Sequence, residues 1–453
     1  MQENLEKRIK RQIIGKNHRF TAIVPLGFER TLVAELKNLG IVAESDHFEI
    51  VDGKVSFTAK IQEAWKTVAY SRIANRVLMQ VADFRAENFR DLEKKAAEIP
   101  WELFLPCHPG AEGDWIPSDG SATPVSMHVT CKHSRLYHSD AVAERFYKVL
   151  KGGRLPPVRT ASLPTPSAGT PRNAPPPSGS ETQHLYVDFI SDRCTVSLDL
   201  AGEELYKRGH QRFVNDAPLK ETIAAAMLFE ASSNIKPQTA DIPFHTPHFT
   251  SHITLIDPMA GSGTFSLEAA YIVSGLIPGK CRDFALKHQP AFKEATWNYL
   301  TRVNQSGGIA KDSGPNPSLR IITSDISERA IEIIKHNVQT SPLPPDTITP
   351  QQKDFFKYTS EEISSASGTI LLLNPPYGKR LDADAPALYA HIGKKLTELA
   401  KGAESPLTVA ILAPKGACTE NLLKNCAALA APGTKQIKTS HGGISLNCFV
   451  ASL

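Results

Sequence analysis

The second half of the chain alternates between short apolar runs and longer amphipathic stretches. The apolar runs cover residues 253–257, 319–324, 368–373 and 407–412, which is the usual length of buried strands. Stretches with helical spacing of apolar residues precede or follow these runs, at 219–230, 264–274, 327–338 and 387–400. This alternation predicts an α/β fold with a doubly wound, Rossmann-like and mostly parallel sheet. Ligands of such sheets bind beyond the carboxyl ends of the strands.

The first half has a less regular pattern. Strands are predicted at 20–24, 125–130, 184–190 and 194–200, and helices at 27–39, 61–79 and 140–150. Together they predict small α+β modules. Residues 152–183 interrupt them with a stretch that is rich in Pro, Ser, Thr and Gly. Such a stretch buries too little apolar surface to offset chain entropy, so we expect a disordered insert there.

Composition narrows the class of protein. A chain of 453 residues is long enough for more than one domain, and 41% hydrophobic with 22% charged residues is ordinary for a globular protein. The seven cysteines are scattered without a Cys-x-x-Cys pair, which favours a reducing cytoplasm over a disulfide framework. No apolar run approaches the ~20 residues that a membrane helix needs. The net charge of +4 is too small to identify a partner.

A glycine-containing loop follows the first predicted strand of the second half. The loop reads Asp257-Pro258-Met259-Ala260-Gly261-Ser262-Gly263-Thr264 and leads into a helix. Glycines let a ligand approach the backbone closely, and the helix N-terminus offers unpaired N–H groups. The loop alone is equally compatible with an ordinary strand-to-helix turn. A P-loop is excluded because no Gly-Lys-Ser/Thr follows.

Acidic residues follow the next two strands. Asp325 ends the strand at 319–324, where an acid of a doubly wound fold binds ribose hydroxyls. It could instead cap the helix that begins near Ser327. Asp354, with Phe355 and Phe356 behind it, could hold an adenine by its amino group and its face, or could belong to an amphipathic surface turn.

The sequence Asn374-Pro375-Pro376-Tyr377 follows the third predicted strand. An ordinary strand end rarely needs this combination, although two prolines do stop a strand. An aromatic amino nitrogen is a poor nucleophile because its lone pair is delocalised. The Asn374 side-chain oxygen and the Pro375 carbonyl could accept its protons and direct the lone pair at an electrophilic methyl group, and Tyr377 could stack on the ring. Such catalysis consists of positioning and preorganised polarity.

These residues resemble the THUMP-containing RNA guanine-N2 methyltransferases, which include bacterial enzymes of large-subunit ribosomal RNA and tRNA enzymes of archaea and eukaryotes. The resemblance extends over most of the chain. It rests on the segments 20–40, 132–136, 207–210, 217–221, 257–264, 277–279 and 374–381, together with Arg282 and Trp297. Ala260 stands where the family has Cys, and the Pro-rich breaks at 105–124 and 152–183 are longer than usual.

The resemblance implies a domain order and a cofactor. An N-terminal ferredoxin-like segment would cover 18–66, a THUMP RNA-binding domain 67–202, and the catalytic domain 203–453. The cofactor would be S-adenosylmethionine, bound by Asp257, Pro258, Gly261, Gly263, Thr264, Asp325, Ile326, Asp354 and Phe355. Residues 374–377 would hold the guanine amino group.

RNA would be the macromolecular partner, with ribosomal RNA favoured over tRNA, held mainly by shape and phosphate contacts. The candidate contacts are basic residues in two clusters and one residue after the Asn-Pro-Pro-Tyr sequence: Lys132, Arg135, Lys207, Arg208, Arg212 and Arg380. The two clusters could equally form a solvated basic face. No metal is expected, because His245, His248 and His252 lie in a Pro/Thr loop without Cys or acidic partners.

Two other functions stay open. The Asn374 chemistry would serve adenine N6 of a nucleic acid or a protein glutamine amide as well as guanine N2, and only the resemblance selects guanine. A non-catalytic RNA-binding assembly factor is the third possibility, against which the intact Asn374 and Asp257 argue.

Overall fold

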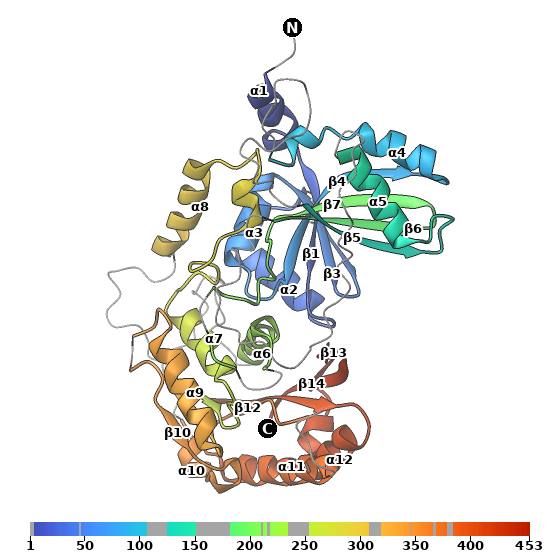
Figure 1. Cartoon of the computed structure of the whole chain (residues 1–453). Coiled ribbons are helices and arrows are strands. Elements are labelled where there is room, and N and C mark those ends of the chain that lie inside the picture. The colour runs from blue at the N-terminus through green and yellow to red at the C-terminus, as the bar shows by residue number, and fades with distance from the viewer. Residues whose placement is uncertain are drawn as a thin grey trace.

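The chain forms two lobes, each built on a seven-stranded sheet (Figure 1). The computed structural model describes residues 4–44, 47–106, 125–150, 182–209, 212–214, 218–233, 253–307, 319–344, 346–365, 368–377 and 384–453. The predicted disordered insert lies outside the described residues except at its end, where β6 already begins at Gln183. Disorder of that insert therefore stays a prediction.

The N-terminal lobe contains one continuous sheet with the strand order β2-β3-β1-β4-β7-β6-β5. Its strands are β1 (His18–Ile23), β2 (Phe48–Val51), β3 (Lys54–Ala59), β4 (Arg76–Arg85), β5 (Val125–Lys132), β6 (Gln183–Ile190) and β7 (Arg193–Asp199). Only the β5–β6 pair is parallel among these described pairings. β4 pairs with β1 on one side and with β7 on the other, so the predicted ferredoxin-like and THUMP segments share a sheet.

One face of this sheet carries the lobe's core. Phe20, Met79, Leu198 and Leu185 lie opposite one another across four strands, and all are buried. These side chains belong to one apolar cluster that includes residues of four helices of this lobe and continues into the C-terminal lobe. The four helices are α2 (Glu29–Asn38), α3 (Ile61–Tyr70), α4 (Phe89–Ala97) and α5 (Ser139–Leu150). The short α1 (Leu5–Ile9) stands at the end of the lobe (Figure 1).

The predicted helix at 61–79 was wrong in its second half. α3 ends at Tyr70, and Ser71 adopts extended backbone. The carboxylate of Glu35 accepts hydrogen bonds from the Ser71 hydroxyl (2.6 Å) and the Arg72 amide (2.8 Å), which holds the chain in its turn toward β4. A contact from α2 therefore ends α3. The predicted domain boundary after residue 66 falls inside α3.

The C-terminal lobe confirms the predicted α/β class. Its sheet has the strand order β10-β9-β8-β11-β12-β14-β13. The strands are β8 (Thr254–Asp257), β9 (Arg320–Asp325), β10 (Pro350–Gln352), β11 (Thr369–Leu373), β12 (Leu407–Pro414), β13 (Lys435–His441) and β14 (Ile444–Ser452). β8 to β12 run parallel, whereas β14 is antiparallel to β12 and to β13.

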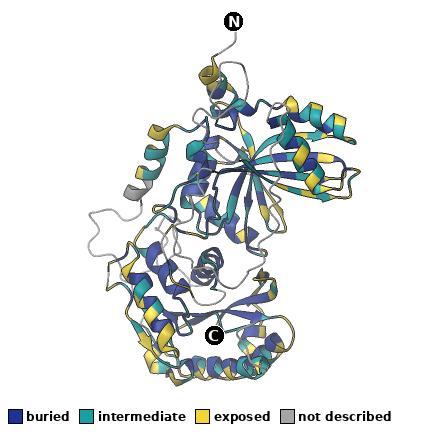
Figure 2. Ribbon diagram, viewed as in Figure 1, coloured by how far each residue is buried: buried dark blue, intermediate teal, exposed yellow. Residues whose placement is uncertain are grey.

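Helices cover both faces of this second sheet (Figure 2). They are α6 (Glu221–Ser233), α7 (Thr264–Val273), α9 (Glu328–Gln339), α10 (Ser360–Ile363), α11 (Ala385–Gly402) and α12 (Ala417–Asn425). The strand order reverses between β8 and β11, which are neighbours in the sheet. The carboxyl ends of those two strands form the topological switch point, where ligands of doubly wound sheets bind.

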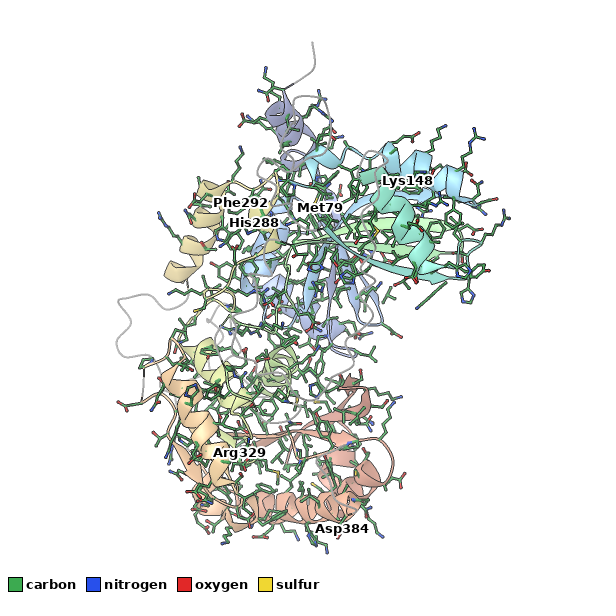
Figure 3. All side chains as sticks on the ribbon, in the orientation of Figure 1. Met79, Lys148, His288, Phe292, Arg329 and Asp384 are labelled. Atoms are coloured by element: carbon green, nitrogen blue, oxygen red, sulfur yellow. The ribbon has the colours of Figure 1, made fainter. Side chains whose placement is uncertain are left out.

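A segment between β8 and β9 leaves the C-terminal lobe and packs on the other one. The Phe292 ring lies 5.7 Å from the Trp65 ring of α3, and Tyr70 donates to the Leu300 carbonyl in α8 (Glu294–Gly307). Phe292 and His288 accordingly lie beside the upper sheet, far from Arg329 and Asp384 on the other lobe (Figure 3). A segment within the predicted catalytic domain of 203–453 therefore packs on the N-terminal lobe, and the bounds of that domain stay a prediction.

Candidate active site

The glycine loop joins β8 to α7 at the switch point. Gly261 and Gly263 both have positive φ angles, 56° and 77°, and Gly263 caps α7. A Cβ at Gly263 would lie 3.2 Å from the Ile334 side chain of α9, so a larger residue would push the two helices apart. At Gly261 a Cβ would meet no described atom within 4 Å. The backbone there is open to a ligand.

Asp325, at the end of β9, holds this loop in place. Its carboxylate accepts hydrogen bonds from the backbone amides of Gly261 (2.8 Å) and Ser327 (2.9 Å). The N-cap of α9 is Ser327, which excludes the alternative that Asp325 caps that helix. The neighbouring Ile326 side chain is 67% exposed, which is unusual for isoleucine and leaves an apolar surface beside the loop.

Asp257, at the end of β8, is buried behind the loop. Its Oδ2 accepts a hydrogen bond from the Ser266 hydroxyl at 2.9 Å, whereas Oδ1 is buried without a hydrogen-bond partner among the described residues. Burial raises the pKa of Asp257 to about 7, and the nearby negative charge of Asp325 adds to the shift. The two acids and the glycine loop are therefore together, as the sequence predicted.

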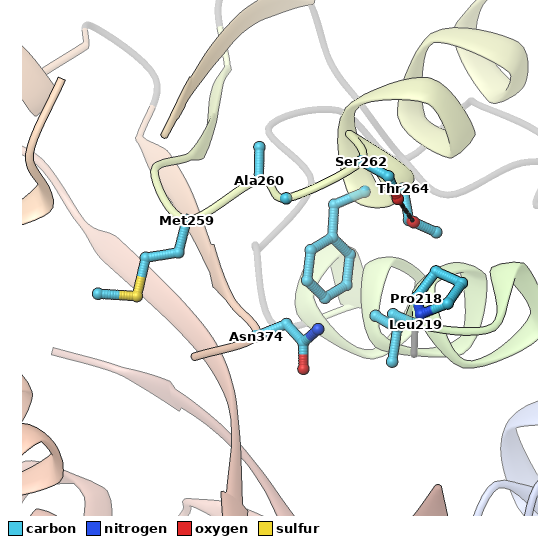
Figure 4. Close-up of a pocket in the computed structure, with 9 residues that line it drawn as sticks. Pro218, Leu219, Met259, Ala260, Ser262, Thr264 and Asn374 are labelled. Carbon is cyan, nitrogen blue, oxygen red and sulfur yellow. Dashed lines mark hydrogen bonds between the residues drawn. The ribbon is translucent and has the colours of Figure 1, made fainter. Parts of the chain in front are cut away.

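A pocket lies between the loop and the end of β11. It encloses about 380 Å³, including the space at its mouth. Its lining is formed by Pro218, Leu219, Met259, Ala260, Gly261, Ser262, Thr264, Phe265 and Asn374. Asn374 lies between Met259 on one side and Pro218 and Leu219 on the other (Figure 4). Its Oδ1 is buried and has no hydrogen-bond partner in the described part of the chain.

An unpartnered amide oxygen is costly to bury, by about 1–3 kcal/mol. Native proteins contain few such atoms, and a catalytic role or a bound partner is one explanation for those that remain. The Asn374 Oδ1 atom can therefore accept a hydrogen bond from a ligand that binds beside the glycine loop. Pro375, which is buried, and Pro376 follow it in a segment without regular structure.

Tyr377 has a partner that the sequence did not suggest. Its hydroxyl lies 3.1 Å from His441 Nδ1, and the two rings meet edge to face at 6.3 Å. His441 ends β13 and is separated from Tyr377 by 64 residues. No local spacing links two residues so far apart, so only the pairing of β13 with β14 in space reveals the contact.

Sequence comparison identifies the family. Residues 208–444, more than half of the chain, match the RMKL-like methyltransferase domain, and residues 19–78 match the RlmL ferredoxin-like domain. The chain belongs to the RMKL-like methyltransferase family. The RlmL ferredoxin-like match extends beyond the predicted end at 66, and the THUMP assignment of 67–202 stays a prediction.

The proteins similar to this methyltransferase include some of similar length and some about twice as long. YpsC of Bacillus subtilis (strain 168), whose name refers to RNA methylation, is 26% identical over 366 residues, which cover 81% of this chain and 80% of YpsC. The ribosomal RNA large subunit methyltransferase K/L of Allochromatium vinosum is 29% identical over 396 residues, 84% of this chain. The chain spans about half the length of that relative, 46%. The crystal structure of SMU.472 complexed with SAH covers 96% of this chain with a TM-score of 0.70 at 22% identity.

Two of the predicted cofactor contacts have side chains that already pack or bond within this methyltransferase. The Phe355 ring is 2% exposed and packs in the core of the C-terminal lobe, so it does not offer its face to a ligand, and a cofactor contact through its backbone stays a prediction. Asp354 accepts a hydrogen bond from the Phe356 amide (3.0 Å) and caps a short 3₁₀ helix at 355–357. Asp354 is partly exposed, and an adenine contact by it stays a prediction.

Arg208 and Arg212 do not face solvent, which corrects their assignment as RNA contacts. Arg208 is 4% exposed, and its guanidinium donates to both Glu268 carboxylate oxygens (3.0 and 3.1 Å) and to two backbone carbonyls. Arg212 pairs with Glu221 and donates to the Thr264 hydroxyl behind the glycine loop. Both arginines stabilise the methyltransferase site from within.

The other predicted RNA contacts are surface residues or lie outside the described chain. Lys132 is exposed. Arg135 is also exposed but pairs with Glu87, and Lys207 pairs with Glu203 at 3.2 Å. Arg380 falls outside the described residues, and RNA contacts by all four stay predictions.

The described residues contain no group of three or more His, Cys, Asp or Glu side chains that could hold a metal ion. His245, His248 and His252 lie outside that part of the chain. Across the same described ranges, no helix is both long and apolar enough to span a bilayer.

Proposed function

We propose that this methyltransferase transfers the methyl group of S-adenosylmethionine to the exocyclic N2 amino group of a guanine in large-subunit ribosomal RNA. One observation carries the proposal: the buried Asn374 Oδ1 lies at the switch point without a partner, beside the pocket of the glycine loop. Membership of the methyltransferase family indicates methyl transfer as the reaction. The Asn374 oxygen is the hydrogen-bond acceptor that can orient a reacting amino nitrogen.

The residues around the pocket fit S-adenosylmethionine. The open backbone at Gly261 and the N-terminus of α7 can receive the polar methionine end of the cofactor. Asp325 can accept ribose hydroxyls with its remaining lone pairs, and the exposed Ile326 offers an apolar surface to the adenine face. SAH is the form that the cofactor takes after losing its methyl group, and its presence in the SMU.472 structure supports this choice.

The chain's own groups would position the reacting nitrogen. Bound S-adenosylmethionine supplies an electrophilic methyl group on a sulfonium. The Asn374 oxygen and the Pro375 carbonyl would accept the two amino hydrogens, so that the nitrogen lone pair points at that methyl group. As the nitrogen–carbon bond forms, the carbon–sulfur bond breaks, and the nitrogen then releases one proton to solvent. No base is required beforehand, because catalysis rests on orientation and fixed dipoles.

Tyr377 would stack on the target base and set its plane. The hydrogen bond between its hydroxyl and His441 fixes the phenol ring beside Asn374. A base in a helix must first be flipped out, which costs a few kcal/mol unless the base is already unpaired. Asp354 would reach the cofactor's adenine amino group through the carboxylate oxygen that does not cap the 3₁₀ helix.

The substrate assignment rests on relatives. The name of the Allochromatium protein favours ribosomal RNA, with tRNA second, and we place the reaction in the cytoplasm, where ribosomes are assembled. Lys132, Arg135, Lys207 and Arg380 remain our candidates for phosphate contacts. Because the chain spans about half the length of the Allochromatium protein, we do not assign the whole activity of that protein to this chain.

The test is to identify the methylated nucleoside. The protein is incubated with labelled S-adenosylmethionine and total RNA from a strain that lacks the gene, and the RNA is digested to nucleosides. We expect label in N2-methylguanosine. Label only in N6-methyladenosine, or only in a protein, would overturn the guanine assignment. Failure to bind S-adenosylmethionine in calorimetry would instead favour an RNA-binding assembly factor.

A further inference from the structure

The N-terminal sheet has a second face that is polar, in contrast to its helix-covered face. Along β6, Leu185, Val187 and Phe189 are buried, whereas the alternate residues His184 and Tyr186 are partly exposed. Successive side chains of a strand point to opposite faces, so His184 and Tyr186 share the polar face. On that face the neighbouring strands β5 and β6 carry aromatic and imidazole rings, which a solvent-exposed sheet face does not require.

Three rings form a cluster on this face. His128 of β5 lies directly opposite Tyr186 of β6, and their ring centroids are 4.6 Å apart with planes 17° from parallel. The His184 ring lies beside that of His128, with centroids 5.3 Å apart and planes 26° from parallel, and a hydrogen bond of 3.0 Å joins His128 Nε2 and His184 Nδ1. The Arg76 guanidinium lies 5.6 Å from the Tyr186 ring on the other side. We call His128, His184, Tyr186 and Arg76 the ring stack.

The ring stack has one covered end and one exposed end. Arg76 is tied down by its ion pair with the fully buried Asp199. His128 is exposed and lies on β5, the edge strand of the sheet among the described strands. The exposed His128 is therefore the end at which a further planar group can extend the stack.

The chemistry of the stack favours an uncharged flat ring. Burial lowers the pKa of His184 to about 4, with the neighbouring His128 and Arg76 adding to the shift, and burial likewise lowers the pKa of His128. Both imidazoles are therefore neutral at physiological pH. Lys132 lies four residues along β5 on the same face, about 13 Å away by strand geometry, and is exposed. An aromatic surface with a lysine at this spacing suits a nucleotide strand, whose bases stack and whose phosphates attract cations.

We infer that the ring stack binds an unpaired nucleotide of the RNA substrate, with a base stacked on His128 and a neighbouring phosphate near Lys132. The inference rests on the proposed RNA substrate, and it adds a second RNA contact on the lobe that does not contain Asn374 (Figure 1). Such a contact holds the RNA away from the reacting base. It contributes to binding and leaves the chemical step unchanged.

The first experiment measures binding of a fluorescently labelled single-stranded oligoribonucleotide to the full chain by anisotropy. His128→Ala removes the exposed ring and should weaken binding by about 5- to 150-fold, the range for losing one stacked base. His128→Tyr keeps a flat ring and should retain affinity within about threefold. His47→Ala, at an exposed histidine off the sheet, is the matched control and should bind as the wild type does. Equal affinity of His128→Ala and the wild type would overturn the inference.

The second experiment separates this inference from the proposed function. With RNA as substrate, His128→Ala should raise KM by a similar factor, while kcat and the affinity for S-adenosylmethionine stay unchanged. A wild type that binds the oligoribonucleotide through His128 but methylates no RNA would overturn the proposed function and leave the ring stack standing. If the wild type methylates RNA and His128→Ala leaves the KM for RNA unchanged, the ring stack proposal is overturned and the proposed function stands.

Discussion

Asp257 illustrates how a single residue at the switch point acquires unusual chemistry. The sequence places an acid at the end of a buried strand, and the fold then buries it almost completely beside a second acid. Its pKa of about 7 means that about half of the molecules carry a proton on this carboxyl at neutral pH. In the unfolded chain the same carboxyl has its ordinary pKa of 3.8.

This shift makes a prediction for stability. Because the folded pKa is raised, the contribution of Asp257 to stability is complete below pH 4 and is lost as pH rises toward 7. Asp257→Asn cannot ionise and should escape that loss. The free energy of unfolding of the variant relative to wild type should therefore rise between pH 4 and pH 7 and level off above, as measured by urea denaturation at each pH. A difference that is flat with pH would show that Asp257 does not carry the raised pKa.

Residues of the site were predictable from the sequence where a motif stands directly after a strand. Asp257, Gly261, Asp325 and Asn374 come together because parallel strands end at one edge. The sequence did not indicate that the Phe355 ring is buried, because an aromatic residue after an acid can pack in a core as readily as against a ligand. His441 was missed because its contact with Tyr377 depends on a strand pairing that no local pattern encodes.

At the scale of elements, the glycine loop and β9 form one unit. The Asp325 carboxylate accepts hydrogen bonds from two backbone amides, one in the loop and one at the start of α9. In addition, the Ala260 amide of the loop donates to the Ser324 carbonyl of β9. The loop conformation with positive φ at two glycines is thereby fixed before any ligand arrives. Preorganisation of this kind lowers the cost of binding.

Asp325→Ala should therefore weaken S-adenosylmethionine binding even though the fold survives. Loss of the loop anchor and of a ribose acceptor should cost about 1.5–3 kcal/mol, or roughly 10- to 100-fold in Kd by calorimetry. Glu328→Ala, three residues along on the exposed side of α9, is the control and should leave the Kd unchanged. Unchanged affinity of Asp325→Ala would refute the role assigned to this acid.

Elements with strong periodicity were predicted well, and those defined by long-range contacts were not. All four predicted strands of the parallel sheet are present. The hairpins β2–β3 and β13–β14 escaped prediction because β2 is short and exposed, and β13 alternates weakly between buried and exposed positions. The helix at 61–79 was extended too far because the Glu35 contact that ends it comes from a different helix.

For the whole molecule, a buried ion-pair network joins the lobes. Glu268 of α7 is 1% exposed and pairs with Arg208 of the linker at 3.0 Å and with Arg72 of the N-terminal lobe at 3.5 Å. Burial alone would raise the pKa of Glu268, but the two arginines hold it below the usual value. The helix α7, which begins at the glycine loop, is thus attached by ion pairs to the N-terminal lobe, for which we propose RNA binding.

Glu268→Gln should destabilise the protein strongly, because it leaves two buried guanidinium groups without a counter-charge. Breaking a buried pair in this way costs about 3–5 kcal/mol in the free energy of unfolding. Glu203→Gln removes the exposed partner of Lys207 and should cost under about 1 kcal/mol. Thermal and urea denaturation of both variants give the comparison, and equal stability of the two would mean that the network contributes little.

The arrangement of the lobes was beyond sequence reasoning. Nothing in the sequence between Asp257 and Asp325 indicated that α8 packs against α3. The shared strand β4 likewise joins two modules that the sequence had separated.

The central claim is that Asn374 acts on the reacting amino nitrogen and leaves cofactor binding to the glycine loop. The most direct measurement is the single-turnover methylation rate of Asn374→Ala at saturating S-adenosylmethionine, alongside its Kd for the cofactor. Loss of an oriented acceptor should lower the rate by about 100-fold or more, the effect of removing one preorganised transition-state contact, with the Kd within about threefold of wild type. A variant that methylates at the wild-type rate, or that loses activity only because it no longer binds S-adenosylmethionine, would contradict the account.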